Sequence, residues 1–252
     1  MSTFASNNTT SIYNRDEFLL NIANKLGRSQ PLDAVERPAF KHHCHQAVMK
    51  DFTQDQLADT LKQYAQTSLG VSVVETTKSE LKMTLREVCH QYCQDEHGAA
   101  KQGETIISAS ETLLNLVDPQ ALSNAHHTVH VWDHQAGYQT NITIAERAQI
   151  GIVMAEQALA ESGTVVLYSD PKQGRAISLL PETSIFVVGK STLLPRLTQA
   201  THALHQKAKR GERIPSCVNF ISGPSSTADI ELIKVVGVHG PVSATYVIVD
   251  DM

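Results

Sequence analysis

The sequence lacks any apolar run approaching the roughly 18 residues that a membrane-spanning helix requires. Its first ten residues are rich in Ser, Thr and Asn and have no apolar core of the kind found in a targeting signal. The net charge is only -5 at pH 7, so nucleic acids and anionic membranes are poor candidates as partners. We therefore expect a cytoplasmic protein with no membrane span and no nucleic-acid partner.

Cysteines are few, and their spacing is not that of a disulfide framework or a metal cluster. Cys44, Cys89, Cys93 and Cys217 lie in a chain of 252 residues, which is long enough to bury a core without covalent cross-links. Cys89 and Cys93 are one helical turn apart on an apolar stripe, whereas cluster motifs need two-residue gaps and four ligands. We interpret these thiols as buried core groups and expect the chain to bind no cofactor of its own.

Histidine is abundant, with twelve residues, and two clusters raise the question of a metal site. One cluster is His42, His43 and His45 with Cys44, and the other is His126, His127, His130 and His134. On one face of an extended strand, residues i and i+4 are about 13 Å apart, which is too far for shared ligation. Because no carboxylate or second ligand set accompanies either cluster, we expect no metal site.

Both nucleotide-binding fingerprints are absent as well, since the chain contains neither a P-loop pattern nor GxGxxG. The apolar pattern of the chain predicts a succession of helices and strands. Apolar periodicity and the capping-box patterns Thr53-x-x-Gln56 and Thr77-x-x-Glu80 indicate where helices begin. Helices are expected from residue 15 to 26, after 53, after 77, and over 146–161, 193–209 and 227–236; strands over 71–74, 105–108, 129–132, 164–168, 177–180, 185–188, 217–221 and 246–249.

This alternation predicts an α/β fold with a Rossmann-like, mostly parallel sheet and flanking helices. We expect a disordered tail over residues 1–14, a helical N-terminal segment over 15–70 and an α/β domain over 71–252.

The most informative segment spans residues 222–231, where a strand ends at Gly223-Pro224 and a helix is expected to begin. A strand, a loop of small residues and a helix start form a common ligand-binding corner of α/β proteins. In a structural interpretation, one of Ser225, Ser226 and Thr227 caps the helix, and Asp229 and Glu231 complement its dipole. We predict that Thr227 is the cap. In a functional interpretation, the loop presents backbone N–H groups to a ligand. Acidic residues in the first turn and the lack of a loop cation favour a hydroxyl-bearing ligand over a bare phosphate.

A second loop, residues 237–241, carries His239 next to Gly240-Pro241. This histidine can serve as a general base or as a donor that holds the turn, and both readings stay open. Arg175 is a loop cation able to meet an anionic ligand, or simply an exposed hairpin residue. Since ligands bind outside the carboxyl ends of parallel strands, we predict one ligand-binding pocket formed by Ser222, Gly223, Ser225, Thr227, Asp229, His239, Gly240 and Thr164.

Several of these stretches together resemble the LUD-domain family, and within it the lactate-utilization protein C branch (LutC or YkgG-like). The stretches are Gly151 with Glu156, residues 162–167, 178–181, 221–231 and 237–241, and near the N-terminus Phe18-Leu19 with Leu26-Gly27-Arg28. The resemblance covers residues 15–250 and is most specific in the two C-terminal motifs.

The resemblance implies a fold similar to the glucosamine-6-phosphate deaminase, ribose-5-phosphate isomerase and CoA-transferase group. It also implies a role in oxidising L-lactate to pyruvate, as a non-cluster subunit or accessory factor beside partner proteins that carry iron–sulfur clusters. Whether this subunit has catalytic residues, or is only a component of an L-lactate dehydrogenase complex, is left open. The alternative hypothesis is a stand-alone enzyme or binding protein for a sugar phosphate, CoA ester or folate-like ligand, which rests on fold analogy alone.

Overall fold

The computed structural model describes residues 13–34, 36, 38–94, 97–99, 101–228 and 233–252, in two compact units. The first unit, Met1–His43, contains helix α1 (Arg15–Lys25), which confirms the predicted helix. Gly27 follows the C-cap with a left-handed φ of 73°, a conformation typical of a glycine that ends a helix. Residues 1–12, most of the predicted tail, lie outside the described residues.

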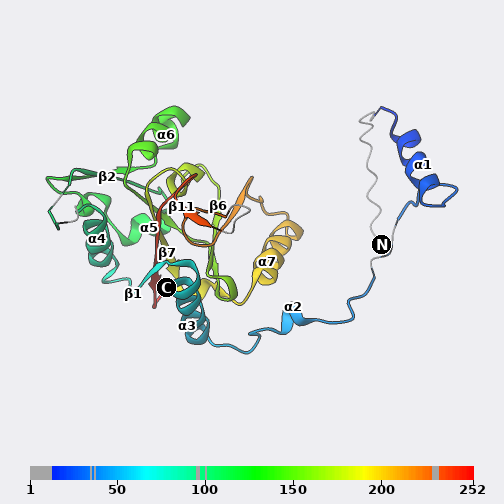
Figure 1. The fold of residues 1–252 in the computed structure, drawn as a ribbon, viewed down its shortest axis with the longest axis horizontal. Coiled ribbons are helices and arrows are strands. Elements are labelled where there is room, and N and C mark those ends of the chain that lie inside the picture. Colours follow the sequence, from blue (N-terminus) through cyan, green and yellow to red (C-terminus); the bar gives the residue numbers. More distant parts are fainter. Residues whose placement is uncertain (1–12, 35, 37, 95–96, 100, 229–232) are drawn as a thin grey trace. The chain divides into compact units, whose positions relative to one another are not determined.

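The second unit, Cys44–Met252, is built on a six-stranded sheet in which every pair of neighbours is parallel (Figure 1). This sheet confirms the predicted α/β class. The strand order is β1-β12-β7-β4-β2-β3. The strands are β1 (Ser72–Thr76), β2 (Gly103–Ile107), β3 (His127–Val131), β4 (Ile150–Met154), β7 (Thr183–Gly189) and β12 (Ser243–Val249).

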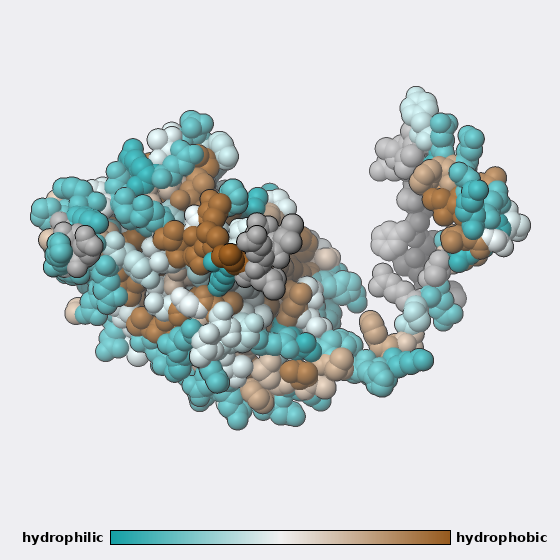
Figure 2. All heavy atoms as spheres, in the orientation of Figure 1, coloured by the Kyte–Doolittle hydropathy of each residue, from teal (hydrophilic) through white to brown (hydrophobic). Residues whose placement is uncertain are grey.

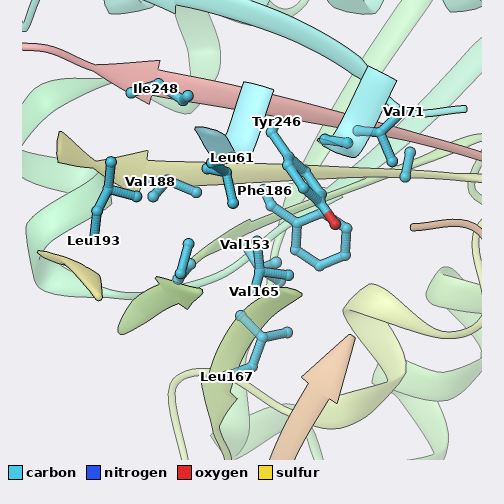
Figure 3. Close-up of a cluster of buried hydrophobic side chains, with 14 of the residues drawn as sticks. Leu61, Val71, Val153, Val165, Leu167, Phe186, Val188, Leu193, Tyr246 and Ile248 are labelled. Carbon is cyan, nitrogen blue, oxygen red and sulfur yellow. The ribbon is translucent and has the colours of Figure 1, made fainter. Parts of the chain in front are cut away.

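Both faces of this sheet are covered, which explains why its central strands are continuous apolar runs. The neighbours Ile185 and Phe186 point to opposite faces. Ile185 packs in a cluster with helix α4 (Leu81–Tyr92). Phe186 packs in a second cluster with helix α3 (Gln54–Tyr64) and Tyr246 (Figure 3). The remaining helices and turns are α2 (Cys44–Ala47), α5 (Glu111–Leu116), α6 (Tyr138–Arg147), α7 (Leu197–Lys209), η1 (Ala65–Leu69), η2 (Pro119–Leu122), η3 (His134–Ala136), η4 (Ala160–Ser162), η5 (Arg175–Ser178) and η6 (Lys190–Thr192).

Helix α3 begins with the predicted capping box. Gln56 N donates to Thr53 Oγ1 over 3.3 Å, and Thr53 N donates to Gln56 Oε1 over 2.9 Å. The second predicted box does not form, because Thr77 Oγ1 donates to the Glu80 carboxylate instead and α4 starts at Leu81. Buried leucines of α3 join the core, so this helix packs with the sheet although it precedes residue 71.

A smaller sheet lies between the main sheet and helix α7, with the order β8-β5-β6-β9. Strand β6 pairs antiparallel with both β5 and β9. The alternating side chains of β6 show the layering, since Val165 packs toward the main sheet and Val166 packs in a cluster with Ala200 of α7. The strands of this sheet are β5 (Gln157–Leu159), β6 (Thr164–Tyr168), β8 (Leu193–Leu194) and β9 (Val218–Ile221).

Two predicted elements between residues 146 and 180 were wrong. The expected helix over 146–161 is replaced by the end of α6, strand β4, strand β5 and turn η4. Its apolar run belongs to a fully buried parallel strand, which periodicity cannot separate from a buried helix. The expected strand over 177–180 is replaced by η5, whose Ile177 carbonyl lies against Gly151.

The helix expected over 227–236 was also wrong. Strands β10 (Ser226–Ala228) and β11 (Lys234–Val236) instead form an antiparallel hairpin, while residues 229–232 lie outside the described part. The strands over 164–168 and 217–221 exist, but as β6 and β9 they belong to the smaller sheet rather than to the parallel one. None of the helices in the described part of the chain has the length and apolar character that crossing a membrane requires.

Candidate functional site

The loop after β9 and the turn before β12 face each other across a cavity of about 330 Å³. Five of the eight residues predicted for the ligand pocket line it: Ser222, Gly223, Ser225, His239 and Gly240. The structure therefore brings together loops that are about fifteen residues apart in sequence, as predicted. That a ligand binds there remains a prediction.

Thr164, a sixth predicted residue, does not line this cavity but contacts Ser222, which does. Its hydroxyl lies 2.7 Å from Ser222 Oγ and 2.7 Å from Ser162 Oγ, and its side chain is buried. The chain of three hydroxyls ties the start of β6 to the end of β9. Thr164 thus positions Ser222 rather than lining the cavity itself.

Tyr246 holds the same loop from the core, and no sequence pattern singled this residue out. Its hydroxyl donates to Gly163 O over 2.7 Å and accepts from Gly223 N over 3.1 Å (Figure 3 shows the ring and its oxygen). Burial raises the pKa of Tyr246 to about 12, so the hydroxyl stays protonated as a donor. The ring also makes an edge contact with Phe186, with centroids 5.7 Å apart.

Backbone contacts hold the two loops together on the other side. Ser225 N donates to Pro241 O and Gly237 N donates to Ser225 O, each over 2.9 Å. A side chain on Gly240 would bring its Cβ within 3.1 Å of Ser225 Cβ, so glycine permits this close approach. Gly223 is needed for its left-handed φ of 73°. The cavity is therefore preformed by main-chain geometry.

The other two predicted site residues are not placed in this cavity. Thr227 lies on β10 and is exposed, so the predicted helix-capping role is wrong because no helix begins there. Asp229 lies outside the described residues, and its role stays a prediction. Arg175, considered as an anion contact, donates from Nε to Asn219 Oδ1 over 3.2 Å.

The cavity does not lie at the carboxyl edge of the parallel sheet, where the pocket was predicted. The cavity is bounded by Ser184 and Ala244, which lie near the amino-terminal ends of β7 and β12. It is at the carboxyl end of β9 only, and β9 is not part of the parallel sheet. The carboxyl edge of that sheet is elsewhere.

Chemically, the cavity offers serine hydroxyls, backbone groups and one imidazole, and the described residues that line it include no Lys, Arg, Asp or Glu. His239 is exposed and makes no hydrogen bond to another described residue, so the structure favours neither of its two predicted roles. Such a lining suits a small hydroxyl-bearing molecule.

Cys89 and Cys93 are buried in the core, as predicted. They belong to a polar chain that the sequence did not reveal: Cys93 Sγ lies 3.1 Å from His127 Nδ1, and His127 Nε2 lies 2.8 Å from Thr105 Oγ1. Burial raises the pKa of Cys89 to about 12 and that of Cys93 above its ordinary value, so both are neutral thiols. Within the described residues, no group of three or more His, Cys, Asp or Glu side chains could hold a metal ion.

Comparison with known proteins gives consistent matches along most of the chain. The family model of the LUD domain matches residues 57–249. "Lactate utilization protein C" of Geobacillus sp. (strain WCH70) is 43% identical over 249 residues, covering 96% of this chain and 98% of the relative. "Uncharacterized protein YkgG" of Escherichia coli (strain K12) is 44% identical, covering 94% and 99%.

Among solved structures, a DUF162 family protein from Deinococcus radiodurans superposes with a TM-score of 0.52 at 15% identity. The match covers 79% of this chain and 99% of that chain. At this identity the likeness concerns the fold alone, and it agrees with the α/β architecture described above.

Proposed function

Because the chain belongs to the LUD-domain family, we propose that it acts in lactate utilization, as the non-cluster subunit or accessory factor of a system that oxidises L-lactate to pyruvate. One observation carries this proposal. Relatives named lactate utilization protein C are 40–43% identical to this chain over nearly their full lengths.

We propose further that the redox centres belong to iron–sulfur partner proteins. The four cysteines of this chain are poorly suited to hold a cluster. Cys44 is exposed on α2, Cys89 is buried on α4, Cys93 is buried directly after α4, and Cys217 precedes β9. A four-cysteine cluster needs all its thiolates around one point. Electron transfer would then take place outside this chain.

An exposed apolar surface beside the cavity supports the proposal that a partner protein binds on this side of the molecule. Apolar side chains gather over the β10–β11 hairpin and the turn that follows (Figure 2): Ile233, Val235, Val236, Val238 and Val242, with exposures of 43–60%. Contiguous exposed apolar patches of this kind are typical of protein contact sites. A partner bound to this patch would lie next to Ser225 and His239.

Deletion of the gene tests the proposal. The deleted strain should fail to grow on L-lactate as the sole carbon source and grow normally on glucose, and the wild-type gene on a plasmid should restore growth on L-lactate. Undiminished growth of the deleted strain on L-lactate would contradict the proposal. Recovery of iron–sulfur proteins with an affinity-tagged chain from lactate-grown cells tests the subunit role.

A further inference from the structure

The parallel sheet has a second place where a ligand can bind, and its position follows from the order of the strands. In the order β1-β12-β7-β4-β2-β3, strands β2 and β4 are neighbours. From β2 the chain continues to β3 on one side, and from β4 it reaches β7 on the other. The loops that leave these two strands diverge, and in open α/β sheets such a switch point at the carboxyl edge is where ligands bind.

A cavity of about 490 Å³ lies at this switch point. Three segments form most of its walls: residues 110–112 after β2, residues 154–156 at the end of β4, and a third segment that includes Tyr168 and residues 170–173; Thr192 and Met252 also line it. We call the space between these three segments the carboxyl-edge crevice. It shares no lining residue with the cavity at Ser225 and His239.

The third wall is fixed by contacts that keep the crevice open. Gln173 is buried, and its amide accepts from Met154 N over 3.3 Å and donates to Met154 O over 3.1 Å. Trp132 Nε1 donates to Pro171 O over 3.0 Å, and Gly174 lies directly against the Trp132 ring. These contacts fix the third wall of the crevice to the end of β4 and to Trp132.

The crevice adjoins a second cavity of about 480 Å³, and the two share Glu156, Tyr168, Asp170 and Pro171 as lining residues. The far end of this second cavity carries Lys207 and Arg213. Neither cation belongs to any of the ion pairs found in the described part of the chain, and Lys207 Nζ lies 5.0 Å from the centre of the Tyr168 ring.

The charges differ along this space, and in the crevice itself Lys172 and Glu111 form an ion pair in which they compensate each other. The shared middle has the carboxylates of Glu156 and Asp170, which accept hydrogen bonds and so suit hydroxyl groups. The far end has two cations, which suit a carboxylate or a phosphate. Ser169 also lines the second cavity, and its buried hydroxyl has no hydrogen-bond partner among the described residues, which is uncommon for a buried polar group.

We propose that the carboxyl-edge crevice and its extension bind a polyhydroxylated organic anion, with the hydroxyls on Glu156 and Asp170 and the anionic group on Lys207 and Arg213. This site is separate from the cavity at Ser225 and His239, and the proposal does not depend on the proposed role in lactate utilization.

Isothermal titration calorimetry of the full chain tests the proposal. Three hydroxylated anions are the probes: gluconate, sorbitol 6-phosphate and AMP. Sorbitol has the hydroxyls without the anion, and inorganic phosphate has the anion without the hydroxyls. At least one probe should bind with a Kd below about 1 mM, and both sorbitol and phosphate should bind about tenfold more weakly or not at all, because each lacks one set of charge-assisted hydrogen bonds. A carboxylate and a phosphate ligand are distinguished by whether gluconate or the phosphates bind.

Variants locate the site. Lys207→Ala and Arg213→Ala should each weaken binding of the successful probe about tenfold, and Glu156→Gln should weaken it too. Lys209→Ala, an exposed lysine on the same helix that lines neither cavity, should leave the Kd unchanged. Melting temperatures check that each variant is folded. The proposal is overturned if none of the three probes binds, if phosphate or sorbitol alone binds as well as they do, or if the Lys207 and Arg213 variants retain wild-type affinity.

Discussion

Replacing Tyr246 by Phe removes a single hydroxyl from the middle of the core and leaves the ring in place against Phe186. The variant loses the hydrogen bonds to Gly163 O and from Gly223 N, and it leaves both of these buried main-chain groups without that partner. Hydrogen bonds of this kind contribute about 1 kcal/mol each, and an unpaired buried group costs about 1–3 kcal/mol. We expect Tyr246→Phe to lower the free energy of unfolding by about 3 kcal/mol.

Urea unfolding at pH 7.5 measures this change, since the midpoint should fall while the slope with denaturant stays constant. Tyr138→Phe is the matched control, because Tyr138 is 77% exposed and its loss should change stability by less than about 0.5 kcal/mol. Equal midpoints for Tyr246→Phe and the wild type would refute the conclusion that this hydroxyl holds the loop at Gly223.

The pH dependence gives an independent signature of the same group. Burial raises the pKa of Tyr246 from its ordinary value of 10 to about 12 in the folded chain. The stability that this group contributes is fully present below pH 10, because it is protonated in both states. It is lost as pH rises from 10 toward 12, since only the unfolded state releases the proton there. This part of the alkaline loss should be missing in Tyr246→Phe, and an unchanged alkaline profile would argue against the shift.

Three further changes test the packing. Leu85→Asp should unfold the second unit, because it would bury an unpaired carboxylate where the Leu85 side chain is fully inaccessible. The control Met83→Asp, on the exposed face of α4, should melt like the wild type. Native melting of Leu85→Asp would refute the placement of α4. Burial lowers the pKa of His127 below its ordinary value of 6.5. The free energy of unfolding should therefore fall as pH drops below 6.5, because the unfolded state takes up the proton first. His127→Gln should reduce this acid sensitivity in urea titrations at pH 7.5 and 5.5. Gly151→Ala should destabilise by about 1–3 kcal/mol or more, because its Cβ would lie 1.8 Å from the Ile177 carbonyl oxygen, and an unchanged urea midpoint would contradict that contact.

The sequence predicted the fold class and most strands correctly because β-branched runs such as those of β7 and β12 are bounded by turns. It failed where tertiary packing overrides local preference. Residues 146–161 are rich in Ala and Glu and read as a helix, but Gly151 lets η5 approach β4 closely, and the run becomes a central strand.

The candidate site was predicted in part. Glycine, proline and serine in the two loops indicated a close approach, and Gly223, Ser225 and Gly240 do line one cavity. The supporting tyrosine could not be found, because Tyr246 is 83 residues from Gly163 and reads as an ordinary apolar strand position. The wrong assignment of β9 to the parallel sheet also hid the carboxyl-edge crevice, whose position depends on strand order, which local patterns do not reveal.

The most direct test of the proposed role measures the rate of L-lactate consumption in a strain that lacks the chromosomal gene and carries plasmid variants. Wild type and His134→Ala, an exposed histidine that lies outside the cavity at Ser225, should restore the rate equally. His239→Ala should reduce it about tenfold, the loss expected for one binding contact of about 1.4 kcal/mol, with equal amounts of folded protein. Consumption as fast with the empty plasmid as with the wild-type gene would contradict a role in L-lactate oxidation, and wild-type rates for His239→Ala would contradict a role for the cavity.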